Sequence, residues 1–377
     1  MKHWKTVLII LPLAVISFLY LSALSRQPAR QISSATPRSE EIKTMEAMYY
    51  DSLSDNKVQC QLCFRKCVIP EGKTGYCRVR ENKEGKLYTL IYGQPSAVHL
   101  DPVEKEPQHH FLPGTDMLCL GTVGCNYKCR HCQNWHLSQA RPGDLRVYDL
   151  PPEEVISMSK RMDVPTISFT YNDPVVMYEY LYDVAKLAKK EGLRILWHSN
   201  GSLNPEPLRE LLRYTDAVTI DLKGFSDEAY RNSEAQLKPV LQSLKIIKES
   251  GVWLEIVYLV IPTVNDDITE IREMCRWLSA NLGSDVPLHF SRFFPNYQLT
   301  HLSPTPVSKL ETAFKIAKEE GINHVSIGNV PGHTNNSTFC VNCEEVVIQR
   351  RHFEVQEIKI TAGRCDSCGE HIPGVWE

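Results

Sequence analysis

The sequence has no excess of charge of one sign: 42 lysine and arginine residues stand against 45 aspartate and glutamate residues, for a formal net charge of −3. This balance does not indicate the basic patch of a nucleic-acid-binding protein, and we expect no nucleic-acid partner. Glycine and proline, at 19 and 23 residues, are too few for a collagenous or low-complexity chain, and no internal repeat is evident. The 377 residues, 42% of them hydrophobic and 23% charged, predict an ordinary globular protein with two or three folded units.

Cysteine is the unusual component. The total of 13 is odd, so disulfides cannot pair every thiol. Eleven of the thirteen form three groups in which cysteines are separated by two or three residues, the spacing of metal ligands. The groups are Cys60, Cys63, Cys67 and Cys77; Cys125, Cys129 and Cys132; and Cys340, Cys343, Cys365 and Cys368. We expect bound metal and a reducing compartment.

The N-terminus carries a hydrophobic run. Residues 7–24 are uncharged and would be about 27 Å long as a helix, which just spans the hydrocarbon core of a bilayer. We predict that residues 1–24 are a membrane anchor or a signal-like segment, with a cleaved signal peptide as the alternative. Basic residues after the run slightly outnumber those before it, which favours a membrane-anchored protein whose body is cytoplasmic. Residues 25–45 are polar and predict a linker.

Short apolar runs alternate with amphipathic stretches from Met117 onward. The runs predict strands at 117–122, 164–169, 193–198, 216–222, 252–260, 286–292 and 324–328. The stretches predict helices that include 174–190, 236–250, 267–281 and 306–319. This alternation is typical of βαβ units, so we predict an α/β fold with a parallel sheet that forms an open or partial barrel. We expect the site at the carboxyl ends of the strands.

The predicted barrel spans residues 111–330. It lies between a Cys-rich N-terminal segment, 46–110, and a C-terminal segment, 331–377. A short helix is expected at 46–53.

The middle cysteine group directly follows the first predicted strand, as Gly121-Thr-Val-Gly-Cys125-Asn-Tyr-Lys-Cys129-Arg-His-Cys132. Three thiolates at a C-x3-C-x2-C spacing can bind three corners of a cubane iron–sulfur cluster and leave the fourth iron without a protein ligand. An open coordination position is where a substrate binds, whereas closed sites tend to be structural. A three-cysteine zinc site with His131 or His136 as the fourth ligand is the alternative.

At these residues the chain resembles the radical S-adenosylmethionine (SAM) superfamily, whose signature is this spacing on the loop after the first barrel strand. More narrowly, it is similar to the pyruvate-formate-lyase-activating-enzyme-like branch, with the radical SAM member of the AmmeMemoRadiSam system as the closest match. The resemblance covers about residues 46–377. Further stretches carry it: Cys60 to Cys67 with Gly75-Tyr-Cys77, Phe169 to Pro174, Ser199 to Gly201, Asp221 to Gly224, Ile261-Pro262 with Asn265-Asp266, Ser291 to Phe293, and Gly328 to Gly332.

The resemblance implies a partial (βα)6-type barrel and an enzyme. It implies a [4Fe–4S] cluster on Cys125, Cys129 and Cys132 that binds SAM and passes one electron into its sulfonium, giving methionine and a 5′-deoxyadenosyl radical. That radical abstracts hydrogen from a substrate, which the sequence does not identify and for which a protein is one candidate. Flavodoxin or ferredoxin is the expected kind of electron donor. The alternative function is a non-enzymatic metal-binding scaffold, which has no need for an open iron.

Three residues at the ends of two strands are predicted to bind SAM. Asp173 matches the carboxylate position of the family, and its alternative role is a helix N-cap before Pro174. Ser199 and Asn200 are placed to bind the SAM carboxylate or ribose, with a plain turn as the alternative.

Two further pairs lie at later strand ends. Asp221 and Lys223 are predicted to act at the barrel mouth, where a charged pair is costly without a purpose; a structural ion pair is the alternative. His289 and Arg292 are predicted to lie near SAM or the substrate.

The two terminal cysteine groups predict further metal centres. Cys340 to Cys343 and Cys365 to Cys368 form paired knuckles, the pattern of a zinc ribbon whose hairpin would use 346–348 and 355–360. An auxiliary iron–sulfur cluster is the alternative there. For the group at 60–77, zinc and an auxiliary cluster stay open as alternatives. Cys119 and Cys275 are expected to be buried small hydrophobes.

Overall fold

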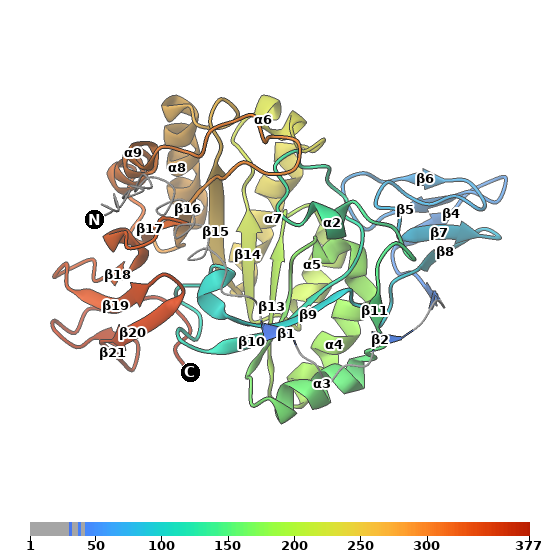
Figure 1. Ribbon diagram of the computed structural model, residues 1–377, viewed down its shortest axis with the longest axis horizontal. Coiled ribbons are helices and arrows are strands. Elements are labelled where there is room, and N and C mark those ends of the chain that lie inside the picture. Colours follow the sequence, from blue (N-terminus) through green and yellow to red (C-terminus); the bar gives the residue numbers. More distant parts are fainter. Residues whose placement is uncertain (1–29, 32–36, 39–41) are drawn as a thin grey trace, which may run out of the picture.

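The computed structural model describes residues 30–31, 37–38 and 42–377. A nine-stranded sheet forms its centre (Figure 1). In sheet order the strands are β1 (Arg30–Gln31), β9 (Ala97–Pro102), β10 (Asp116–Gly121), β12 (Thr166–Phe169), β13 (Arg194–Ser199), β14 (Ala217–Asp221), β15 (Trp253–Val260), β16 (Leu288–Arg292) and β17 (Val325–Gly328). The strands from β10 to β17 pair in parallel, whereas β9 and β1 add antiparallel at the other edge.

Helices connect the parallel strands and cover one face of the sheet (Figure 1). They are α3 (Pro152–Arg161), α4 (Tyr178–Lys190) after the 3-10 turn η2 (Pro174–Met177), α5 (Pro205–Leu212), α6 (Asp227–Arg231), α7 (Leu237–Ser250), α8 (Ile268–Leu282) and α9 (Val307–Glu319). Their ends follow ordinary capping rules. Asp267 accepts the backbone N–H groups of Thr269 and Glu270 at the start of α8, and Gly251 takes a left-handed conformation after α7.

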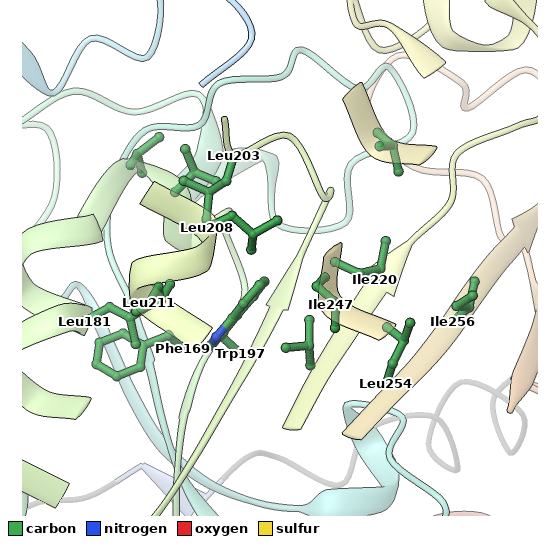
Figure 2. Packing of buried hydrophobic residues seen from close by; sticks show 14 of the residues in the cluster. Phe169, Leu181, Trp197, Leu203, Leu208, Leu211, Ile220, Ile247, Leu254 and Ile256 are labelled. Carbon is green, nitrogen blue, oxygen red and sulfur yellow. The ribbon is translucent and has the colours of Figure 1, made fainter. Parts of the chain in front are cut away.

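The two faces of the sheet pack differently because side chains alternate along a strand. Ile195 and Trp197 of β13 belong to the large cluster between sheet and helices, part of which Figure 2 shows. The Trp197 indole N–H donates to Thr215 Oγ1 at 2.9 Å, so its buried polar atom is satisfied. On the opposite face, Leu196 packs with Ala217 and Phe111 in a small separate cluster. The apolar cluster on this face, which is the face opposite the helices, is small, so the face has room for polar groups as well.

Two small Cys-containing units flank the sheet, and they lie at opposite ends of the molecule (Figure 1). The N-terminal unit has two three-stranded sheets: β3 (Met45–Glu46), β8 (Lys86–Thr89) and β7 (Arg80–Lys83), and β4 (Tyr50–Ser52), β5 (Val58–Cys60) and β6 (Val68–Ile69). The C-terminal unit has the strands β18 (Thr338–Phe339), β19 (Val346–Arg351), β20 (Glu354–Ile358), β21 (Ile360–Thr361) and β22 (Arg364–Cys365). Its β19–β20 hairpin lies where the sequence predicted one.

The seven predicted strands are all present, and the α/β prediction is confirmed. The parallel strands number seven in the described chain, one more than in the predicted (βα)6-type barrel. The helix predicted at 46–53 is wrong, because that stretch contributes to β3 and β4, which pair with β8 and β5. The predicted linker, 25–45, is not independent of the folded body where it is described: Arg30–Gln31 pairs with β9, and β2 (Pro37–Arg38) pairs with β11 (Val147–Tyr148).

The prediction of a membrane-anchored protein is corrected. No helix among residues 30–31, 37–38 and 42–377 combines the length and the apolar character that crossing a bilayer requires. Residues 7–24, on which the prediction depended, lie outside the described residues.

Candidate functional site

A large cavity opens at the carboxyl ends of the parallel strands. The cavity volume is about 450 Å³, and the cavity is partly open to solvent. This volume lies within the roughly 300–1,000 Å³ of an ordinary ligand pocket, so the cavity has room for a bound cofactor. Residues that end β12, β13, β14, β16 and β17 contribute to its wall, as expected for a site on a parallel sheet.

The thiols of Cys125, Cys129 and Cys132 belong to this wall. The loop that carries these cysteines follows β10, and two of its glycines lie very close to neighbouring backbone. A Cβ atom at Gly124, where φ is +84°, would lie 2.7 Å from the carbonyl oxygen of Cys77, and one at Gly121 would lie 3.0 Å from that of Thr170. Only glycine fits these close approaches.

Asn172, just after β12, also holds the cysteine loop. Its amide nitrogen donates to the carbonyl oxygen of Gly124 at 2.8 Å, and its Oδ1 accepts the N–H of Thr122 at 2.9 Å. A zinc site would need a histidine nitrogen close to all three sulfur atoms. Among the described residues, no histidine joins the three thiols in a group whose ligand atoms all lie within 4.8 Å of one another. His136 is exposed and outside the cavity wall, so the three-cysteine zinc alternative finds no support.

Three of the predicted SAM-binding residues are joined by hydrogen bonds. Asp173 accepts the hydroxyl of Ser199 at 3.1 Å, the backbone N–H of Asn200 at 2.6 Å and that of Val175 at 3.0 Å. The bond from Val175 makes Asp173 the N-cap of η2, as the capping alternative predicted. Burial raises the pKa of Asp173 to about 6, although these hydrogen bonds oppose the rise. Asn200 Nδ2 donates to Asn126 Oδ1 at 2.8 Å, which links this corner to the cysteine loop.

Asp221 and Lys223 form an ion pair in the cavity wall. The Lys223 ammonium lies 2.6 Å from Asp221 Oδ2, and His198 Nε2 lies 3.2 Å from Asp221 Oδ1. Burial alone would raise the pKa of Asp221, but the charges of Lys223 and His198 outweigh it and hold that pKa below its usual range. The pKa of His198 is raised, because its attraction to Asp221 outweighs the effect of burial. The predicted pair is therefore both structural and cavity-facing.

The two residues predicted on β16 lie in different surroundings. His289 lines the cavity, with Nε2 at 2.6 Å from Glu255 Oε2 and Nδ1 at 2.7 Å from Ser326 Oγ. Arg292 does not belong to the cavity wall. Its Nε donates to the carbonyl oxygen of Thr305 at 2.8 Å, and its guanidinium lies over the ring of Phe294. The prediction that Arg292 contacts SAM or the substrate finds no support in this position.

The sequence analysis missed the floor of the cavity, which residues 103–110 form. We call this segment the floor loop; it begins with the 3-10 turn η1 (Val103–Lys105) and precedes β10. The side chains of inward-facing strand residues hold it. Gln108 Nε2 donates to Thr219 Oγ1 at 2.9 Å, and the N–H groups of His109 and His110 donate to the two carboxylate oxygens of Glu255 at 2.9 and 2.8 Å.

Glu106 of the floor loop is buried and lines the cavity, where its carboxylate accepts the Ser168 hydroxyl at 2.7 Å. Burial raises the pKa of Glu106. The available sequence signal was a run of charged residues and histidines, Glu-Lys-Glu-Pro-Gln-His-His, which ends at residue 110, a few residues before the first barrel strand.

The four C-terminal cysteines lie close together. Among the described residues, they are the one group of potential metal ligands whose ligand atoms all lie within 4.8 Å of one another. The Sγ–Sγ distance is 3.6 Å for Cys340–Cys368 and 3.8 Å for Cys343–Cys365. A tetrahedral zinc ion with Zn–S bonds of about 2.3 Å needs sulfur atoms about 3.8 Å apart. The site thus has the dimensions of a single-ion site. Cys119 and Cys275 are fully buried, as expected.

Comparison with known proteins places this site in a family. A model described as the radical SAM superfamily matches residues 120–278. The uncharacterized protein MJ0808 of Methanocaldococcus jannaschii is 42% identical over 329 residues, which cover 87% of this chain and 98% of that protein. The chain belongs to the radical SAM superfamily.

Other matches are more distant. The pyruvate formate-lyase-activating enzyme of Clostridium pasteurianum is 24% identical over 161 residues, 40% of this chain and 64% of that enzyme. The crystal structure of a radical SAM methyltransferase from Sphaerobacter thermophilus is similar with a TM-score of 0.46 and 12% identity, covering 85% of this chain and 83% of that one. None of these relatives carries the AmmeMemoRadiSam name, so that narrower assignment stays a prediction.

The radical SAM family uses a [4Fe–4S] cluster and SAM, and the residues of the cavity fit both. Three thiols on one glycine-bounded loop supply the ligands, and the cavity beside them is large enough for SAM. Asp173 adds a buried carboxylate that no lysine or arginine pairs with in the described part of the chain.

Proposed function

We propose that this radical SAM protein is an enzyme that reductively cleaves SAM and abstracts a hydrogen atom from a protein or other large substrate. The observation that carries the proposal is the placement of three cluster-binding thiols in the wall of a solvent-open cavity at the carboxyl ends of the parallel strands. When bound, the cluster and SAM supply a one-electron cleavage that gives methionine and a 5′-deoxyadenosyl radical, which takes hydrogen from the substrate.

The residues around the thiols suit the parts of SAM that need partners. Asp173 would accept hydrogen bonds from the amino group, because its carboxylate is buried and lacks a cationic partner among the described residues. Ser199 and Asn200, which already contact Asp173, would bind the carboxylate or ribose. Asp221 and Lys223 would orient polar groups of SAM from the next strand end.

The substrate would occupy the space between SAM and the floor loop. Glu106, His109 and His289 line that part of the cavity. Residues of the C-terminal unit, Asn336, His352 and Phe353, contribute a further wall. The pyruvate formate-lyase-activating relatives match less than half of this chain, so their named activity does not identify this substrate.

The C-terminal cysteines would bind structural zinc. Their Sγ separations of 3.6 and 3.8 Å agree with one tetrahedral ion and are too short for a cluster of several irons. The alternative of an auxiliary cluster in this unit is therefore disfavoured.

Anaerobic reconstitution tests the proposal. The full chain is loaded with iron and sulfide, reduced by dithionite or by a flavodoxin or ferredoxin system, and supplied with SAM. We expect 5′-deoxyadenosine and methionine in equal amounts, at a rate that depends on the reductant. A chain that takes up iron and sulfide but never forms 5′-deoxyadenosine would instead support the metal-binding scaffold.

A further inference from the structure

A second, smaller cavity lies where the N-terminal unit meets Asn126 and η2, and the proposed SAM chemistry does not use it. The four cysteines of this unit line it, and other residues that contribute are Arg65, Arg80 and Asn126. Cys60 and Cys63 are buried, and Cys67 and Cys77 are partly buried. Four cysteines around one cavity make a complete ligand set for a metal centre.

Arg80 brings an unusual cation to this cavity. Its side chain is 2% exposed, and Nη2 donates to Glu179 Oε1 and to the carbonyl oxygen of Met48, both at 2.7 Å. Its Nε and Nη1 have no hydrogen-bond partner within the described chain. Buried N–H groups of a guanidinium are costly to leave unpaired, so an acceptor of negative charge is expected beside them. The sulfur atoms of an anionic metal centre meet that requirement.

The spacing of the thiols distinguishes two kinds of centre. The C-terminal cysteines have the close approach of a single-ion site, all within 4.8 Å, but the N-terminal cysteines form no such group in the part of the chain that the structure describes. They share a cavity at wider spacing, which a cluster fits because its cysteines bind different iron atoms. We propose that Cys60, Cys63, Cys67 and Cys77 bind an iron–sulfur cluster, with Arg80 donating hydrogen bonds to its sulfur atoms.

This second centre would lie directly behind the loop of the SAM-binding cluster. Asn126, which follows Cys125, lines the N-terminal cavity. Arg65 Nε donates to the carbonyl oxygen of Asn126 at 2.6 Å, and a Cβ at Gly124 would collide with the carbonyl oxygen of Cys77. The two ligand sets therefore pack back to back, and the N-terminal cluster would stabilise the loop that holds the other.

The test uses the full chain with Cys125, Cys129 and Cys132 all replaced by alanine, which removes the SAM-binding cluster. After anaerobic reconstitution with iron, sulfide and zinc, the metals and the acid-labile sulfide are counted per chain, and electron paramagnetic resonance is recorded after dithionite reduction. We expect iron and sulfide in equal amounts and a signal from a reduced cluster. Adding Cys60→Ser and Cys63→Ser is expected to remove both.

The matched control adds Cys340→Ser and Cys343→Ser to the same background, and it is expected to lose zinc while it keeps iron and sulfide. Absence of sulfide from the triple alanine variant, or zinc bound at the N-terminal cysteines, overturns the proposal. Sulfide that persists in a folded Cys60→Ser/Cys63→Ser variant overturns it as well. If that variant does not fold, the iron and sulfide counts of the triple alanine variant and of its C-terminal control test the proposal instead. Because the triple variant is not expected to cleave SAM, this result is independent of the proposed enzymatic function.

Discussion

Arg350 Nη2 lies 2.6 Å from the carbonyl oxygen of His109, a contact between residues 241 positions apart in the chain. Arg350 is buried in the C-terminal unit, and His109 belongs to the floor loop. The guanidinium also donates to Thr338 Oγ1 at 2.8 Å and lies 3.5 Å from the carboxylate of Glu104. One side chain thus attaches the C-terminal unit to the cavity floor.

Replacing Arg350 should therefore destabilise both the C-terminal unit and the floor loop. Arg350→Met leaves Glu104 as a buried charge without its cation, and we expect the free energy of unfolding to fall by about 3–5 kcal/mol. Hydrogen exchange should rise in residues 103–112. Arg351 is exposed and provides the matched control: Arg351→Met should change stability by less than about 0.5 kcal/mol. Equal effects of the two substitutions would contradict this role of Arg350.

Removing any ligand of the SAM-binding cluster should abolish SAM cleavage without emptying the other metal sites. Cys125→Ala, Cys129→Ala and Cys132→Ala each remove one of three thiolates, so 5′-deoxyadenosine formation should fall to the level without protein. Cys275→Ala changes a buried cysteine outside every group and should keep the activity. A ligand variant that cleaves SAM at the wild-type rate would refute the site.

SAM binding should weaken in acid because of Asp173. Its pKa of about 6 exceeds its ordinary value of 3.8, so the proton on Asp173 favours folding below pH 3.8, and this contribution is lost as pH rises through 6. The amino group of SAM needs the ionised form. We therefore expect the dissociation constant to increase about tenfold per pH unit below pH 6, measured by equilibrium dialysis without oxygen. Asp173→Asn should bind SAM weakly and without this pH dependence; a pH dependence that survives in it would point to another group.

The C-terminal zinc site should stabilise its own unit. Zinc binding contributes to folding free energy, so Cys340→Ser should release zinc and make residues 331–377 sensitive to limited proteolysis. The absorbance of the SAM-binding cluster should persist. Equal loss of the zinc and of that absorbance would show that the two regions fold as one unit.

Local patterns were enough to predict the strands and to divide the cysteines into groups. A run such as Val164 to Phe169 is β-branched and apolar, and the spacing of Cys125, Cys129 and Cys132 is a property of one short loop. The helix predicted at 46–53 failed because β3 and β4 depend on pairing with β8 and β5, which no local pattern reveals.

Long-range contacts explain what the sequence did not show. Glu106 and His109 matter because the floor loop enters the barrel and binds Ser168 and Glu255, partners that lie 62 and 146 residues away. Arg80 is likewise paired with Glu179, at a separation of 99 residues. Arg292 looked similar to His289 on the same strand, but only the packing of the loop after β16 directs its guanidinium to Thr305.

The floor loop also has an evolutionary consequence. The cavity wall combines strand ends and the cysteine loop with two other segments, residues 103–110 and the C-terminal unit. These two segments lie outside the repeating strand–helix units, so they can change while the strand ends and the cysteine loop keep their residues. A lineage could exchange one reactant for another by altering these two segments alone, and retain the same radical-generating machinery.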